Sequence, residues 1–77
     1  MRAAEVIKDK KYGAVVGCLG NDISTDFNAR NIEIAGERFE VEKFSVVNSA
    51  SDILVGFMIL NEKNPKKIPL GTITVID

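Results

Sequence analysis

The chain has 77 residues, which makes one domain near the lower size limit for independent folding. Ten basic and eleven acidic side chains give a net charge of −1, so the overall charge argues neither for nor against a nucleic-acid partner. The single cysteine, Cys18, excludes an internal disulfide, and there is no histidine. Without a secretory segment or about 20 consecutive apolar residues, the expected location is a reducing cytoplasm, with no membrane partner.

Six short runs rich in β-branched and aromatic residues are separated by turn residues, and no segment has the length and periodicity of a helix. The runs are Ala4–Ile7, Ala14–Leu19, Asn31–Ile34, Arg38–Val47, Ile53–Leu60 and Gly71–Ile76. Short connections predict antiparallel pairing of neighbouring strands. Closure would remove exposed sheet edges, so we predict an all-β fold: one small closed antiparallel six-stranded β-barrel over residues 1–77.

The first segment, Met1–Asp9, is either a first strand or a frayed arm. The run Ala14–Leu19 is apolar throughout, as in a strand that is buried on both faces or bent sharply in a barrel. Three glycines flank or interrupt it, namely Gly13, Gly17 and Gly20. Because glycine in a strand marks a bulge, a bend or a close approach, we expect backbone geometry to fix all three.

Residues 23–30 predict a surface loop anchored by Phe27, and the less favoured alternative is a short helix beginning at Asp22 or Ser24. After the next run, Gly36-Glu37 predicts a hairpin turn of two residues.

The run Arg38–Val47 loses its alternating phase at Lys43 or Ser45, which predicts a β-bulge. Ile53–Leu60 has the pattern of the most buried strand, and the last strand is expected to be paired. The predicted interior consists mainly of Val15, Cys18, Val41, Ile53, Val55, Phe57, Ile59, Ile73 and Val75.

Few residues suggest catalysis or a bound cofactor. Cys18 lies in an apolar run without a neighbouring base, so we expect an inert core thiol and not a nucleophile. Asp22 and Asp26 are expected to be solvated carboxylates and not a metal site. A P-loop motif is absent, so we expect no nucleotide bound by this chain alone, no cofactor and no enzymatic activity.

Two lysine clusters are the candidate binding residues. They comprise Lys8, Lys10, Lys11, Lys63, Lys66 and Lys67. Lysines in turns usually serve only solubility. In a small barrel, however, both turns could fall at one end and form a patch that contacts phosphates.

The order of signals resembles the second-domain β-barrel of translational GTPases, the elongation factor Tu-like family. Tyr12-Gly13-Ala14-Val15-Val16-Gly17-Cys18-Leu19-Gly20 is similar to a shortened form of that family's glycine–valine stretch. Phe39-Glu40-Val41-Glu42-Lys43-Phe44 is similar to its next strand motif. Two later segments also match, namely Ser51-Asp52-Ile53-Leu54-Val55-Gly56-Phe57 and Lys67-Ile68-Pro69-Leu70-Gly71-Thr72-Ile73.

The resemblance covers roughly residues 4–76 and implies a translation-related barrel that lacks the GTPase domain, so it implies no GTP hydrolysis. It departs from the family at Ser51, where the family has glycine. The function it implies is a non-catalytic module that binds RNA or a ribonucleoprotein or translation partner. The alternative is a protein–protein interaction or assembly module with no nucleic-acid role, which could act as a homodimer.

Overall fold

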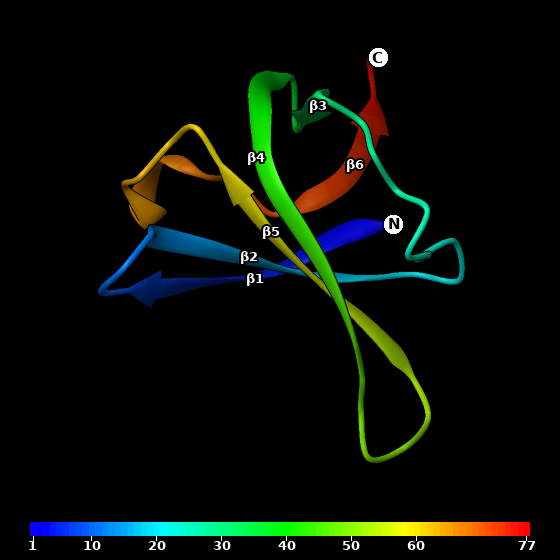
Figure 1. Ribbon diagram of the computed structural model, residues 1–77. Helices are drawn as coiled ribbons and strands as arrows, with labels where there is room; N and C mark the ends of the chain where they lie inside the picture. Colours follow the sequence, from blue (N-terminus) through cyan, green and yellow to red (C-terminus); the bar gives the residue numbers. More distant parts are fainter.

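The computed structural model describes residues 1–77 and shows a closed barrel of six antiparallel strands (Figure 1). The strands are β1 (Arg2–Asp9), β2 (Gly13–Leu19), β3 (Asn31–Ile34), β4 (Glu37–Asn48), β5 (Leu54–Leu60) and β6 (Gly71–Val75). One 3-10 turn, η1 (Pro65–Lys67), precedes β6. The predicted all-β closed barrel is confirmed, and each predicted run corresponds to one strand.

The strands follow the order β1-β2-β5-β4-β3-β6 around the barrel, which closes between β6 and β1. β2 therefore pairs with β5, and β3 pairs with β6. The expectation that all consecutive strands pair is wrong for β2–β3 and β5–β6. These strands are joined by the two longest connections, residues 20–30 and 61–70, which are long enough to lead to a strand elsewhere in the barrel.

Two local predictions for the central hairpin hold approximately. The turn lies at Ala35 and Gly36, one residue earlier than predicted, and both residues have positive φ, 50° and 81°. Such a pair is typical of the two-residue turns that match the twist of antiparallel strands. The predicted bulge is present in β4, where the register with β5 shifts between Val41 and Lys43.

The barrel interior is formed by alternate residues of the strands. Its fully buried side chains include Ile32, Ile34, Met58, Leu60, Val16 and Cys18. Residues 23–30 form the predicted surface loop, in which Ile23 is buried and Phe27 packs against Phe44 with ring centroids 4.5 Å apart. This loop, which connects β2 to β3 along the chain, therefore covers part of the core.

The predicted interior needs correction at several positions. Cys18, Ile59 and Ile73 are buried, and Val41 packs partly against the core, but Ile53 is 57% exposed because it precedes β5 in the turn of the β4–β5 hairpin. Val75 is 52% exposed because β6 pairs with β1 only through Gly71 and Thr72, which leaves the end of β6 with one neighbour.

The phase of the apolar strands was also predicted wrongly. Ala14, Val16 and Cys18 of β2 belong to the core, as do Met58 and Leu60 of β5. Side chains alternate between the faces of a strand. The remaining positions therefore point outward, which corrects the interior assignment of Val15, Val55 and Phe57. Ile59 shares their side of β5 but is buried, with 7% of its surface exposed.

The glycine expectation holds at two of three positions. Gly13 and Gly20 have positive φ, 83° and 155°, which side chains rarely adopt. Gly17 does not, and a Cβ there would lie 3.6 Å from the Glu5 carbonyl oxygen, an ordinary contact. A side chain is less easily accommodated at Gly56 than at Gly17, because a Cβ at Gly56 would lie 2.6 Å from the Phe44 ring.

Candidate nucleic-acid interface

The two lysine clusters lie in two separate connections. Lys8 is near the end of β1, and Lys10 and Lys11 lie in the turn to β2. The others, Lys63, Lys66 and Lys67, belong to the connection between β5 and β6, and the last two lie in η1. All six side chains are exposed.

Backbone packing brings the two connections together at one end of the barrel. η1 contacts β1 and β2, and the two connections lie at the left of Figure 1. Gly13 is the point of closest approach, since a Cβ there would lie only 2.5 Å from the Lys63 carbonyl oxygen. The absence of a side chain at Gly13 therefore allows the β5–β6 connection to lie against the β1–β2 turn.

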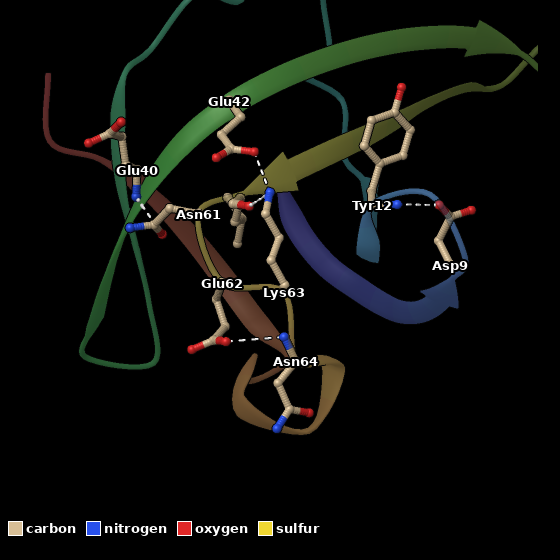
Figure 2. A network of polar contacts seen from close by, with 9 residues as sticks. Asp9, Tyr12, Glu40, Glu42, Asn61, Glu62, Lys63 and Asn64 are labelled. Atoms are coloured by element: carbon tan, nitrogen blue, oxygen red, sulfur yellow. Dashed lines mark hydrogen bonds and ion pairs between the residues drawn. The ribbon is translucent and has the colours of Figure 1, made fainter.

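Lys63 differs from the other five lysines because it is engaged within the chain. Its Nζ forms an ion pair with Glu42 and donates a hydrogen bond to the Leu60 carbonyl oxygen at 3.0 Å (Figure 2). These contacts tie the start of the connection to β4 and β5. The remaining five lysines have no ion pair, so their charges are available to a ligand.

Local side-chain hydrogen bonds hold both turns in shape. The Asp9 carboxylate accepts hydrogen bonds from the backbone N–H groups of Lys11 and Tyr12, at 2.9 and 2.7 Å. In the other turn, the Asn64 side chain accepts from the Lys66 N–H at 3.0 Å. Such turns are typical of Asp and Asn, and they fix the backbone that carries the lysines.

Aromatic character at this end is limited to Tyr12, which is partly buried beside the Lys11 side chain. The Lys11 Nζ lies 5.2 Å from the centre of the Tyr12 ring, within the range of a cation–π contact. The end of the barrel where the two lysine-bearing connections meet, which we call the lysine end, thus presents positive charge with little aromatic surface for base stacking.

An open groove of about 680 Å³ adjoins the lysine end, between the β3–β4 turn and η1. Lys66 and Lys67 line it together with Arg38, and Glu37 and Glu62 place two carboxylates on the same groove. Arg38 was missed by sequence analysis because 28 positions separate it from Lys66. The only available signal was its place directly after a hairpin turn.

The other candidate residues have different environments. Cys18 is fully buried, its Sγ lies 3.7 Å from the Val16 carbonyl oxygen, and burial raises the pKa of the thiol to about 11. The Asp22 carboxylate accepts a hydrogen bond from the Met1 amino group, which lowers its pKa. No surface groove is lined by Cys18, or by Asp22 together with Asp26.

The structure contains no group of three or more cysteine, aspartate or glutamate side chains that could hold a metal ion. The structure has no helix that is long and apolar enough to cross a membrane. No family model, curated protein or solved structure matches this chain.

Proposed function

We propose that this chain is a non-catalytic, translation-factor-like β-barrel that binds RNA, or a ribonucleoprotein, through its lysine end. The observation that carries the proposal is the meeting of two lysine turns that are more than 50 positions apart in the sequence. Five lysines there lack an internal ion pair. The closed six-stranded barrel is compatible with the resemblance of the sequence to the second domain of translational GTPases.

Lysine side chains suit contacts with the RNA backbone. Each ammonium is a flexible point charge that can approach a phosphate and displace its counterions, so the affinity depends steeply on salt. Arg38, on the adjoining groove, adds a planar donor that can bind a phosphate through two hydrogen bonds. Because few aromatic side chains adjoin the lysines, the proposed contacts are with the sugar–phosphate backbone and the shape of the RNA, and few are with its bases.

The proposal is tested with tRNA and ribosomal RNA fragments in a binding titration at about 50 mM salt, where phosphate contacts are strong. We expect Lys66→Ala/Lys67→Ala to weaken binding and to reduce its salt dependence. A matched control is Arg2→Ala/Arg30→Ala, which also removes two positive charges, but at the start of β1 and immediately before β3. No binding by the wild type, or equal losses in both variants, would contradict the proposal.

A second function, protein assembly without nucleic acid, is supported by a different surface. Several large apolar side chains are exposed, among them Ile7 at 40% and Val47 at 48%. Scattered apolar residues need no explanation, but a continuous apolar face indicates an interaction site. Measuring the molecular mass in solution in the absence of RNA tests this function independently of the first.

A further inference from the structure

The β4–β5 hairpin extends beyond the rest of the barrel. β4 is the longest strand, and its second half pairs only with β5, as far as Asn48 opposite Leu54. The strand on its other side, β3, is short and pairs with β4 only as far as Glu40. Figure 1 shows the hairpin as a projecting ribbon with no other strand beside its far end. One edge of β4 therefore has no neighbouring strand over residues 42–48.

A backbone hydrogen bond at the hairpin turn shows which groups lie on this open edge. The Ser49 N–H donates to the Ile53 carbonyl oxygen at 2.9 Å, so Ser49 faces β5. Successive residues of an antiparallel strand direct their backbone groups to opposite edges. Ser45 and Val47 therefore also face β5. The residues that alternate with them face the open edge, namely Phe44, Val46 and Asn48. Their N–H and C=O groups have no strand to pair with.

The loop of residues 23–30 does not fill the open edge. Pairing on this side of β4 ends where the Val41 N–H donates to the Arg30 carbonyl oxygen at 2.8 Å. Beyond that bond, residues 27–30 and residues 41–44 line an open groove of about 210 Å³. The open edge thus begins at this groove and runs outward along the hairpin.

The open edge also lacks the features that usually protect an edge strand. Natural sheets shield such edges with proline, charged side chains, bulges or a covering segment. The β4 bulge and the charged residues Glu42 and Lys43 lie at the barrel end of the edge. Residues 44–48 are uncharged, contain no proline and keep a regular register with β5. An edge of this kind takes up a further extended strand through backbone hydrogen bonds.

We propose that the open edge of β4 pairs with the same edge of a second copy of this chain, about a two-fold axis at Val46. The inference rests on the assembly function proposed above, names its interface and does not depend on RNA binding. In a two-fold interface each copy offers the same surface, and an axis perpendicular to β4 runs the two strands antiparallel. The two hairpins then form one continuous sheet.

The positions of the open-edge residues favour this register. With the axis at Val46, Phe44 lies opposite Asn48 of the second copy, and the two Val46 residues lie opposite each other. Each such pair exchanges two hydrogen bonds, which gives about six across the interface. A shift in either direction leaves an end residue without an open-edge partner. The same register sets Ser45 opposite Val47 of the second copy, so Val47, 48% exposed, gains a cross-strand neighbour.

The first experiment measures the mass of the whole chain, without RNA, over a concentration series by sedimentation equilibrium. We expect a monomer–dimer equilibrium that Asn48→Pro weakens at least about tenfold, because proline removes an N–H at both ends of the interface. Leu54→Pro is the matched control, since Leu54 lies opposite Asn48 but faces the other edge of the hairpin. Proline is tolerated where a strand N–H faces solvent, so both variants should fold, as circular dichroism can check.

The outcomes separate this interface from the assembly function. A wild type that stays monomeric up to about 1 mM would overturn both. A wild-type dimer that Asn48→Pro and Leu54→Pro weaken equally would leave the assembly function standing and overturn pairing through β4.

Cysteine cross-linking tests the register without proline. In the Cys18→Ala background, Ser45→Cys/Val47→Cys places thiols opposite each other across the axis, within reach of a disulfide. Lys43→Cys/Ser45→Cys has the same spacing within the chain, but position 43 lies opposite Ser49 of the second copy. Under mild oxidation we expect a disulfide-linked dimer mainly from the first variant. Equal yields from the two variants would overturn the proposed pairing.

Discussion

The inner and outer faces of β2 and β5 have similar apolar composition but different environments. On the inner face, Val16 and Met58 are completely buried and pair with each other. On the outer face, Val15 and Phe57 remain partly accessible and lie outside the core. Burial stabilises in proportion to the apolar area removed from water, so only the inner face contributes fully to the stability of the single chain. The side chains of the outer face remain partly accessible to water.

Truncating one large side chain on each face to alanine is expected to give the largest difference in the free energy of unfolding. Met58→Ala removes a fully buried side chain and leaves a cavity, so we expect a loss of about 2–5 kcal/mol in the free energy of unfolding. Phe57→Ala removes a larger side chain from the outer face, yet we expect only about 1 kcal/mol because part of it is already in water. Urea unfolding at a concentration where the chain is monomeric measures both.

Equal losses for Met58→Ala and Phe57→Ala would show that the outer side chain contributes to monomer stability as an inner one does. A larger loss for Phe57→Ala that appears only at high protein concentration would instead indicate self-association, because association adds to apparent stability by mass action.

The same comparison explains what the sequence could and could not predict. Turn residues and β-branched runs located all six strands, and closure followed from their number and length. The phase of the apolar runs was ambiguous, because Ala14–Leu19 and Ile53–Leu60 are apolar on both faces and alternation gives no signal there. In β3, where Ile32 and Ile34 alternate with Asn31 and Glu33, the inward positions were evident.

Glycines on the two faces provide a second contrast. Gly56→Ala points a methyl group inward, where its Cβ would lie 2.6 Å from the Phe44 ring and 3.3 Å from the Cys18 Cβ. We expect a loss of about 2–3 kcal/mol from overpacking, measured as a lower urea midpoint. Gly17→Ala should change stability by less than about 0.5 kcal/mol, because its Cβ makes only ordinary contacts and strand glycine is itself unfavourable.

The sequence-based expectation that backbone geometry fixes Gly17 is therefore not met, because a Cβ there makes only ordinary contacts. If Gly17→Ala destabilised the chain as much as Gly56→Ala, the assignment of Gly17 to the outer face would be wrong.

The lysine end was only partly predictable. Composition identified its six lysines, but their meeting depends on Gly13 and on η1 packing against β1 and β2, which are long-range contacts. The engagement of Lys63 with Glu42 could not be foreseen either, because it depends on the register of β4 against β5 and on the path of the chain after β5.

A hydroxyl group placed on each face gives a third, smaller contrast. Cys18→Ser buries a hydroxyl in the core, where a single weak acceptor, the Val16 carbonyl oxygen, lies 3.7 Å from the present sulfur. We expect a loss of about 1–2 kcal/mol, with RNA binding unchanged in the folded protein. Val15→Thr adds a hydroxyl on the outer face, where water can reach it, and should cost less than about 0.5 kcal/mol.

Thermal unfolding of both hydroxyl variants, together with the RNA titration, measures these effects. A Cys18→Ser variant with full stability and no function would contradict the assignment of Cys18 as an inert core residue.

The last contrast is the dependence of stability on alkaline pH, which also separates the two faces. Burial raises the pKa of the Cys18 thiol from 9.0 to about 11 in the folded chain. The unfolded chain therefore loses this proton first, so the contribution of Cys18 is complete below pH 9 and is lost as the pH rises from 9 to about 11. Subtracting the pH profile of Cys18→Ala isolates this contribution from that of the lysines.

A cysteine moved to the outer face completes the test. Val15→Cys in the Cys18→Ala background places the only thiol where it is partly accessible, and we expect it to titrate near its ordinary pKa and to react quickly with an alkylating reagent. The wild-type thiol should react only when the barrel opens, because Cys18 is completely buried. Parallel pH profiles for wild type and Cys18→Ala between pH 9 and 11, or equal alkylation rates at the two positions, would show that β2 does not separate a closed interior from an accessible exterior.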